Sequence, residues 1–518
     1  MHFLKNKSFV LKAAIFATGF AGIVAEYVLS TLATYFIGNS IFQWTMIVSL
    51  MLFCMGLGSR LSKLINKNLI RNFLFLEISL SLVVAFSSIL VYTIAAFSSS
   101  YNLLIYTLSM LVGLLIGLEI PLVIRINNEY DDLKTNISSI LEKDYYGSLL
   151  GGVFFAFIGL PVLGLSYTPF VLGLINFLVA CLVLLKFKDK LIENGQLKSL
   201  SILLSFILLI LIFGIVNTNS VIQWGEQNKY QDKIVFSEQT KYQKIVLTEW
   251  KDEHWLYLNG NLQFCSIDEK MYHEPLVHPI MQLAHHPENI LVLGGGDGCA
   301  VREILKYDSV KKIDLVDLDP SMTNLGKENP ILININEGAM HSNKLTIYNE
   351  DGFHFIEQNT SDFYDVIIID LPDPRNVELG RLYSHEFYTH CYRKLRPNGL
   401  VITQSGSPYF ATKAFKCIDK TLKSAKFNTV QMHNQIITMG QWGWTIGAKK
   451  ITSKELKQQL KNLNFKAPTK WINHEAMQLL TSFGKEDYFT DSSNEIRVNK
   501  IHDPVLYQYY LKGNWDLY

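Results

Sequence analysis

The sequence predicts an N-terminal bundle of transmembrane helices, joined to an α/β domain with a parallel sheet and a small β-sheet ahead of it. Three observations in the 518 residues predict this fold. Long apolar runs dominate residues 1–217, whereas residues 222–518 have the composition of a soluble protein. Short β-type stretches follow, and strands then alternate with helices, which is typical of a parallel sheet covered by helices on both faces.

Seven apolar runs in the first half have about the length that crosses a bilayer as a helix, ~20 residues. They lie at residues 10–37, 41–59, 72–96, 102–124, 146–164, 166–185 and 199–216. Lys5 and Lys7 before the first run would also fit a cleaved signal peptide, but the six further runs argue against it. We therefore predict a multi-pass membrane protein with about seven spans within residues 1–217.

Lysine and arginine residues predict which loops face the cytoplasm. They cluster before the first run and after the second, fourth and sixth runs, and loops with such a bias are usually cytoplasmic. If the seventh run crosses the membrane, the soluble half lies outside the cell. If that run is re-entrant or lies along the interface, the soluble half lies inside, so both placements stay open.

Three carboxylates lie in or near the predicted spans, at Glu26, Glu77 and Glu119. A charge at that depth costs about 2.5–3.5 kcal/mol on insertion scales. These side chains are therefore either protonated or hydrogen-bonded between helices, or they form a cation site inside the bundle. The sequence favours neither interpretation over the other.

Composition narrows the function classes. The net charge is +1, which gives no reason to expect nucleic acid as a partner. The six cysteines contain no CxxC pair, and the histidines show no metal-ligand spacing. We therefore predict no disulfide framework and no metal site, and the cysteines fit a reducing compartment.

The second half divides into three predicted parts. Residues 222–275 are expected to form the β-subdomain, with a hairpin turn at Asn259-Gly260. Residues 276–450 carry the alternating strands and helices of a Rossmann-like, class I methyltransferase-type domain, with strands in "NILVLGGGDG", "KKIDLVDLDP", "KLTIYNEDG", "YDVIIIDLPDP" and "GLVITQS". Residues 451–518 form a C-terminal extension.

Acidic side chains follow four successive strands, at the edge of the sheet where ligands bind in such folds. They are Asp297 after the first strand, Asp317 and Asp319 at the end of the second, Asp351 after the third, and Asp370 and Asp373 after the fourth. One acid in such a place is usually a helix cap or a turn former. Acids at four successive strand ends indicate a negatively charged cleft.

The first strand ends in a glycine-rich turn that includes Gly294 and Gly296. Such a turn lets a ligand approach the backbone closely, although by itself it also serves dinucleotides. Asp297 within the turn would repel a pyrophosphate and suits a cationic ligand. Asp317 at the end of the next strand suits ribose hydroxyls. A sulfonium nucleoside fits both carboxylates.

Several motifs resemble those of the polyamine aminopropyltransferases, or spermidine synthases. They are "LVLGGGDG", "YHE" at Tyr272–Glu274 and "DVIIIDLPDP", and the chain as a whole, including the tail "HDPVLYQYYLKGNW", is similar to the membrane-bound branch. The resemblance implies transfer of an aminopropyl group from decarboxylated S-adenosylmethionine to putrescine, which gives spermidine and methylthioadenosine. It implies no prosthetic group, and a cytoplasmic catalytic half, because the nucleoside donor would be made there.

The resemblance also implies a role for each matching residue. Those expected to bind the donor nucleoside are Gln243, Asp317, Asp351, Gly352, Gly294 and Gly296. Those expected to bind the amine chains are Tyr272, His273, Asp297 and Asp373. Asp370 would accept the proton. Gln231 has a similar sequence context to Gln243, but it lies one strand too early.

The expected chemistry explains why two carboxylates end one strand. The attacking amine is protonated in water, with a pKa near lysine's ~10.4, and only its neutral form is a nucleophile. Asp370 and Asp373 can attract the cation, and one of them can accept its proton as attack begins. The sulfonium is already a good leaving group, so the reaction needs no metal. The neighbouring prolines restrict the turn that carries both acids.

The chain departs from the soluble members of the family on the acceptor side. "DSxDP" is "DLPDP" here, so Leu371 replaces a small hydroxyl residue, and Val377 replaces a proline. Ile437, in "ITMGQWGW", stands where those members carry a tyrosine that contacts the amine. We therefore expect putrescine to react with reduced apparent affinity, and the Ile437→Tyr variant to bind it better.

Two other functions stay open. A methyltransferase would use intact S-adenosylmethionine on the same sheet, although Asp297 should repel the carboxylate of that donor. A non-catalytic polyamine sensor or transporter would need no positioned base such as Asp370, but the glutamates in the spans favour it. The expected partners are a small amine and the lipid bilayer, and a homo-oligomer is compatible with both.

Overall fold

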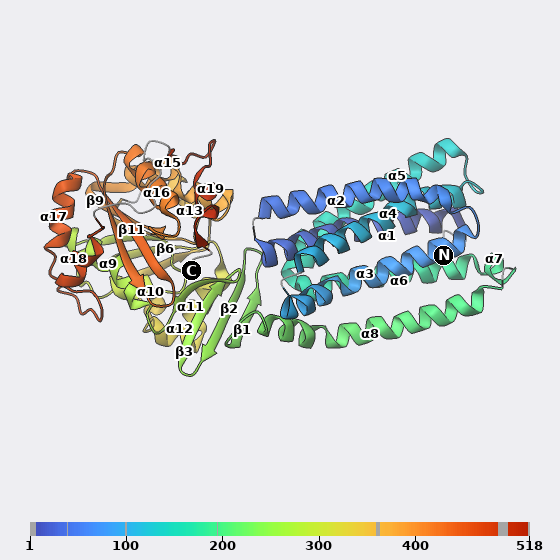
Figure 1. Cartoon of the computed structure of the whole chain (residues 1–518), viewed down its shortest axis with the longest axis horizontal. Coiled ribbons are helices and arrows are strands. Elements are labelled where there is room, and N and C mark those ends of the chain that lie inside the picture. The colour runs from blue at the N-terminus through green and yellow to red at the C-terminus, as the bar shows by residue number, and fades with distance from the viewer. Residues whose placement is uncertain are drawn as a thin grey trace. The chain divides into compact units, whose positions relative to one another are not determined.

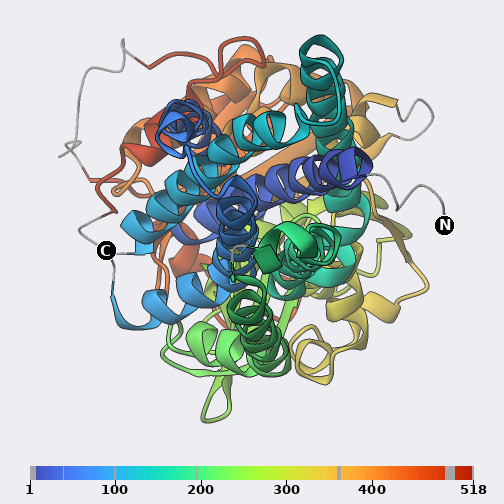
Figure 2. The ribbon, with the colours of Figure 1, turned by 90° about the vertical axis from the view of Figure 1, so that its right-hand side faces the viewer.

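The computed structural model describes residues 7–38, 40–98, 101–193, 195–358, 363–484 and 496–515. The chain divides into two compact units, Met1–Lys233 and Ile234–Tyr518. The long helices of the first unit run side by side as a bundle, and the second unit contains both sheets (Figures 1 and 2).

The first unit consists of helices. They are α1 (Lys7–Ile37), α2 (Ser40–Leu61), α3 (Leu69–Phe97), α4 (Tyr101–Asn127), α5 (Leu133–Phe154), a π-helical stretch (Phe155–Leu163), α6 (Gly164–Lys186), α7 (Lys188–Glu193) and α8 (Leu197–Gln227). By length and composition, six helices among the described residues could cross a membrane, with Leu133–Lys186 counted as one. Apolar side chains also cover the outer face of α8, where Phe213 and Val216 are 70% and 73% exposed. An apolar outer surface of this kind suits lipid rather than water.

The stretch Leu133–Lys186 folds back on itself. The Thr168 hydroxyl donates a 2.6 Å hydrogen bond to the carbonyl of Gly159, although nine residues of straight helix would separate the two by about 13.5 Å. Gly164, with φ +63°, lies at the reversal. Each of the seven predicted apolar runs therefore lies within its own helical limb, and α8 continues beyond the predicted end of the last run to Gln227.

The basic loops gather at one end of the bundle. Arg125 at the end of α4 donates hydrogen bonds to the carbonyls of Ile65 and Ser62, in the connection after α2. Lys12 near the start of α1 forms an ion pair with Asp131, which follows α4. Because consecutive long helices alternate in direction, the C-terminus of α8 lies at the opposite end of the bundle from these loops.

Two of the three carboxylates in the bundle take part in polar contacts between helices. The hydroxyl of Thr18 on α1 lies 2.6 Å from a carboxylate oxygen of Glu119 on α4 and 3.4 Å from one of Glu77 on α3. All three side chains are buried, whereas Glu26 on α1 is half-buried. Hydrogen bonding between helices, one of the two interpretations drawn from the sequence, is thus observed for Glu77 and Glu119.

The second unit begins with an antiparallel four-stranded sheet in the order β1-β2-β3-β4. Its strands are β1 (Lys233–Gln239), β2 (Lys244–Trp250), β3 (Glu253–Leu258) and β4 (Asn261–Cys265). Asn259 and Gly260 both have positive φ, 51° and 77°, as a two-residue type I′ hairpin turn requires. The predicted hairpin turn is confirmed.

The main sheet has seven strands in the order β10-β11-β9-β8-β5-β6-β7. They are β5 (Asn289–Gly294), β6 (Lys312–Val316), β7 (Leu345–Tyr348), β8 (Tyr364–Asp370), β9 (Leu395–Gly406), β10 (Asn428–Ile436) and β11 (Gly440–Ala448). Strands β5 to β9 are parallel, and β10 and β11 are antiparallel. Because β5 pairs with both β6 and β8, the strand order reverses there, and the crevice beyond its carboxyl end is the place where such sheets bind ligands.

Helices surround the main sheet and confirm the predicted Rossmann-like fold. They are α9 (Lys270–Leu283), α10 (Cys299–Ile304), α11 (Pro320–Glu328), α12 (Pro330–Ile335), α13 (Gly352–Gln358), α14 (Val377–Gly380), α15 (His385–Lys394), α16 (Thr412–Ser424), α17 (Ser453–Lys461), α18 (His474–Leu480) and α19 (Leu506–Leu511). The strands β5 and β8 are almost wholly apolar between their ends, and their side chains form the buried core between the two helical layers.

Candidate active site

The glycine turn after β5 brings two predicted site residues together. Gly294 has φ +84°, and a Cβ atom there would lie 2.1 Å from the carbonyl oxygen of Asp370. The next residue, Gly295, donates its backbone N–H to the same carbonyl at 3.1 Å. Only glycine permits so close an approach, and as a result Asp297 in the turn and Asp370 at the end of β8 face one crevice.

His273, Asp297 and Asp370 form the centre of the site. One polar atom from each lies within 4.8 Å of the others, and the Tyr272 hydroxyl donates a 2.7 Å hydrogen bond to Asp370 Oδ1. Burial, together with the charge of Asp297, raises the pKa of Asp370 to about 6 despite the opposing effect of His273. At pH 7 this carboxylate is ionised and is a better proton acceptor than an ordinary aspartate.

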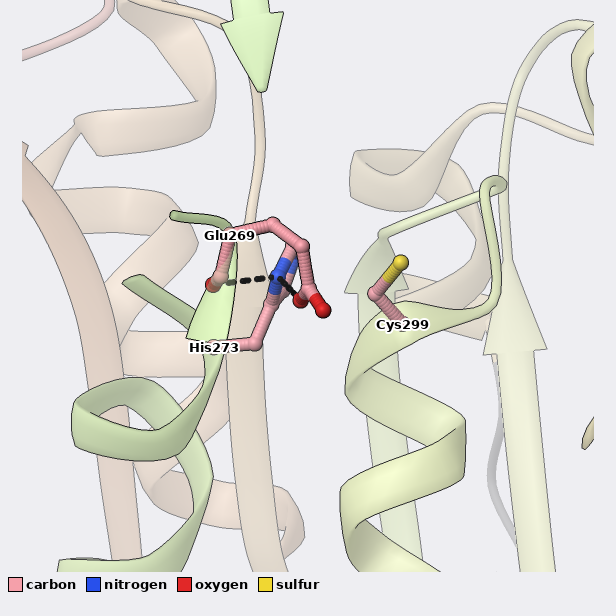
Figure 3. Close-up of side chains that lie close together, drawn as sticks. All are labelled: Glu269, His273 and Cys299. Carbon is pink, nitrogen blue, oxygen red and sulfur yellow. Dashed lines mark hydrogen bonds and ion pairs between the residues drawn. The ribbon is translucent and has the colours of Figure 1, made fainter. Parts of the chain in front are cut away.

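Glu269, four residues before His273 on the same helical face, fixes the imidazole (Figure 3). His273 Nδ1 lies 2.8 Å from Glu269 Oε2 and 3.0 Å from the Glu269 carbonyl. Both are acceptors, so Nδ1 carries a hydrogen and Nε2 is left for the crevice. Burial alone would lower the pKa of His273, but the hydrogen bond and charge of Glu269, together with the charges of Asp297 and Asp370, raise it.

The side chains of Glu269, His273 and Cys299 lie close enough together to resemble a metal site (Figure 3). However, the guanidinium of Arg302 already donates to Glu269 Oε2 at 2.8 Å. Burial raises the pKa of Glu269, but His273 and Arg302 outweigh it and lower that pKa to about 2. A fixed cation on the shared carboxylate would repel a metal ion, so this cluster is better described as an ionic network that holds His273.

Residues predicted to bind the nucleoside lie at the ends of β6 and β7. Asp317 accepts hydrogen bonds from the backbone N–H groups of Gly296 and Asp319, and burial raises its pKa to about 6. Gln243, just before β2, donates to Asp319 Oδ2 at 3.0 Å. The structure therefore brings Gln243 from the small sheet to the same strand end as Asp317.

The third strand end carries Asp351, which forms an ion pair with Arg381 and accepts the backbone N–H of His354 at 3.0 Å. Gly352 is the first residue of α13 and packs against Leu293 of β5. Gln231, in contrast, is exposed and belongs to the first unit.

Asp373 has partners that the sequence did not indicate. The Tyr510 hydroxyl donates to Asp373 Oδ2 at 2.6 Å, Arg375 Nη2 lies 3.5 Å from the same oxygen, and Gln404 Nε2 lies 3.5 Å from Oδ1. Tyr510 is 137 residues away along the chain, so no local pattern marks it. The contact of Glu269 with His273 could have been found, because residues at i and i+4 share a helix face.

The sequence singles out Leu371, Val377 and Ile437 as unusual residues on the acceptor side of the site. In the structure they lie near Asp373 or on the surface. The Leu371 carbonyl accepts hydrogen bonds from Tyr383 and from Gln404. Val377 begins α14, whose N-cap is Asn376. Ile437 lies in the turn between β10 and β11 and is 70% exposed.

Comparison with known proteins places this site in a family. The sequence model of the "Spermine/spermidine synthase domain" matches residues 269–459. "Polyamine aminopropyltransferase 2" of Aquifex aeolicus is 42% identical over 506 residues, which cover 98% of this chain and 99% of that one. "Polyamine aminopropyltransferase" of Oceanobacillus iheyensis is 37% identical, with 96% of each chain covered.

Among solved structures, a spermidine synthase in complex with the transition-state analogue AdoDATO is 27% identical, with a TM-score of 0.44 over 49% of this chain and 86% of that one. The near-complete alignment with the bacterial relatives above extends over both units. The resemblance seen in the motifs is thus confirmed, and this chain belongs to the polyamine aminopropyltransferase (spermidine synthase) family, a family of transferases of polyamine biosynthesis.

Proposed function

We propose that this aminopropyltransferase moves the aminopropyl group of decarboxylated S-adenosylmethionine to putrescine and releases spermidine and methylthioadenosine. The observation that carries the proposal is the convergence of His273, Asp297 and Asp370 at the carboxyl ends of β5 and β8. The two carboxylates favour ligands with positive charge, and both the sulfonium donor and the amine acceptor have it.

The negative charge of Asp297 favours the decarboxylated donor over intact S-adenosylmethionine. Asp297 lies next to the glycine turn, where an intact S-adenosylmethionine would have to place a carboxylate near a second carboxylate. Removal of that group leaves only the cationic amine and sulfonium, which Asp297 attracts. Asp317 and Gln243 at the neighbouring strand end fit the ribose and the rest of the nucleoside.

Asp370 is the proposed proton acceptor. The amine nitrogen attacks the carbon bonded to the sulfonium, a C–N bond forms, the C–S bond breaks and its electron pair stays on sulfur. The nitrogen then loses a proton, and Asp370, with its pKa of about 6, can take it. The hydrogen bond from Tyr272 fixes the orientation of that carboxylate.

The test is turnover by the detergent-purified full chain. We expect methylthioadenosine to be released from decarboxylated S-adenosylmethionine with putrescine, and no methyl transfer from intact S-adenosylmethionine. If no amine in a panel of mono-, di- and triamines reacts while intact S-adenosylmethionine donates a methyl group, the proposal is wrong and the methyltransferase alternative replaces it.

The Asp370→Asn variant tests the base. We expect turnover to fall about 10²–10⁴-fold, as is usual on removal of a general base, and binding of methylthioadenosine to persist. Asp365→Asn, at the other end of the same strand, is the matched control because Asp365 caps backbone N–H groups outside the site. Near-normal turnover in Asp370→Asn would remove this residue from the mechanism.

We also propose that the first unit is embedded in the membrane and that the catalytic unit faces the cytoplasm, where a nucleoside donor is available. The arrangement of the helices offers a counter-argument: seven crossings would place the catalytic unit on the side opposite the basic loops, which the positive-inside rule puts in the cytoplasm. Protease treatment of inside-out vesicles decides the question. Digestion of the catalytic unit supports the proposal, and its protection would overturn it.

A further inference from the structure

Recognition of an amine at Asp373 calls for a neighbouring side chain that can also bind the amine. A diamine acceptor has one nitrogen that attacks, near Asp370, and a second that must be held farther along the crevice. Asp373, three residues beyond Asp370, is placed for that second nitrogen. Ile437 offers it no hydroxyl, because its side chain is aliphatic and is largely exposed to solvent.

The C-terminal segment supplies a hydroxyl instead. Tyr510, on α19, donates to Asp373 Oδ2 at 2.6 Å and is only 2% exposed. The centroid of its ring lies 4.7 Å from that of the Trp515 ring and 5.4 Å from the Arg375 guanidinium. The side chain is therefore fixed in place before any ligand binds, so little conformational entropy is lost when it makes a further contact.

The Tyr510 hydroxyl matters for amine binding because Arg375 also lies beside Asp373. Its guanidinium lies 3.5 Å from Asp373 Oδ2 and also donates to Asn261. An amine that approaches Asp373 therefore meets a carboxylate whose charge is already partly neutralised. An uncharged acceptor beside the carboxylate restores an attractive site. The Tyr510 hydroxyl donates to Asp373 and also interacts with Arg375, and its second lone pair can accept an N–H from an ammonium group.

We propose that Tyr510 is a specificity-determining residue that selects acceptors with a second, distal ammonium group. Its hydroxyl donates to Asp373 and accepts from the distal nitrogen, so that the C-terminal segment completes the acceptor site. The inference rests on the proposed transfer to a diamine, and it names the group that recognises the far end of that diamine.

The experiment compares two acceptors in three forms of the full-length protein in detergent. Putrescine has the distal ammonium, and n-butylamine has the same four carbons with a hydrogen in place of that ammonium. In Tyr510→Phe we expect the KM for putrescine to rise about 10–100-fold, because a hydrogen bond to a charged group is lost, with a smaller change in kcat. The KM of n-butylamine, or its inhibition constant if it reacts too slowly, should stay unchanged, as should the KM of the nucleoside donor.

Tyr507→Phe is the matched control. Tyr507 lies on the same helix, and its hydroxyl accepts a hydrogen bond from the exposed side chain of Gln508, so its loss should leave both acceptors unaffected. A second set of variants tests the coupling. Because the Tyr510 hydroxyl is proposed to contact both Asp373 and the distal nitrogen, the effects of Tyr510→Phe and Asp373→Asn on the KM for putrescine should not be additive in the double variant.

Each outcome decides a different point. If Tyr510→Phe weakens putrescine and n-butylamine equally, the tyrosine only supports the fold and the inference is wrong. The inference is also wrong if the kinetics with putrescine are the same in Tyr510→Phe and in the wild type. If the wild-type protein transfers to no amine at all, the proposed function fails and the inference falls with it, whereas normal wild-type transfer with an unaffected Tyr510→Phe variant overturns the inference alone.

Discussion

At the residue scale, burial makes two carboxylates of the site more basic than an ordinary aspartate. Burial raises the pKa of both Asp370 and Asp317 to about 6, and in each case a neighbouring acid adds to the rise. The pKa of Asp370 suits a proton acceptor at neutral pH. The same burial opposes folding, because a charge that is poorly solvated in the folded state is well solvated in the unfolded chain.

This cost gives a prediction about stability and pH. The folded-state pKa of Asp370, about 6, lies above the unfolded value of ~3.9. Between those values the folded protein binds more protons, so its free energy of unfolding falls as pH rises through this window and stays lower above pH 6. Asp370→Asn removes the buried charge, and we expect its Tm to exceed that of the wild type by a few degrees at pH 8.

Thermal unfolding of the two proteins at pH 8 and pH 4.5 measures the effect. The advantage of Asp370→Asn should shrink at pH 4.5, where the wild-type carboxyl is largely protonated when folded. The Asp365→Asn control should show no such pattern. A Tm difference that is the same at both pH values would mean that the carboxylate charge is not the cause.

At the scale of elements, the ends of the strands position the acidic side chains of the site, and Asn499 positions Tyr510. Gly294 lets the end of β5 press against the end of β8. The C-terminal segment is attached by Asn499, which is 1% exposed. Its Nδ2 donates to the carbonyls of Gly380 and Tyr383, and its Oδ1 accepts the backbone N–H groups of Val505 and Leu506 at the start of α19.

Asn499→Ala should therefore loosen α19 and displace Tyr510. Each buried backbone group left unpaired costs about 1–3 kcal/mol, and several depend on this side chain. We expect faster proteolysis within residues 496–515 and a higher KM for putrescine, with unchanged binding of methylthioadenosine. Gln508→Ala, an exposed position of the same helix, is the control. Unchanged proteolysis together with normal amine kinetics would show that Asn499 does not hold this segment.

At the scale of the whole molecule, the chain consists of two compact units, and the first contains helices long and apolar enough to cross a membrane. The second unit has a core of its own, since both sheets and the described helices that pack on them lie within residues 233–518. We expect residues 228–518, which begin just after α8, to fold without detergent and to bind methylthioadenosine. The full chain, in contrast, should stay with membranes in alkaline carbonate, because helices such as α8 expose apolar side chains.

Fractionation of cells that express each form measures this prediction, and a thermal shift with methylthioadenosine reports on the fragment. Release of the full chain by carbonate without detergent would contradict the membrane proposal. An insoluble fragment would instead show that the catalytic unit depends on the helical bundle for folding.

Local patterns in the sequence determined much of this protein. The apolar runs each became a helical limb, and the alternation after residue 276 became the parallel part of the sheet. Asp297 and Asp370 lie together as expected, because the carboxyl ends of parallel strands meet at one edge and a glycine turn leaves room there. These features follow from periodicity, strand direction and backbone freedom, all of which a short stretch of sequence carries.

Only the tertiary structure decided which partners these residues have. Tyr510 reaches Asp373 across 137 residues, Arg381 pairs with Asp351, and Thr18 joins Glu77 and Glu119 between three helices. The reversal at Gly164 likewise divides one helical stretch into two limbs. The physical reason is that such contacts depend on how whole elements pack, and the energy of packing is shared among many side chains far apart in the sequence rather than recorded in any one motif.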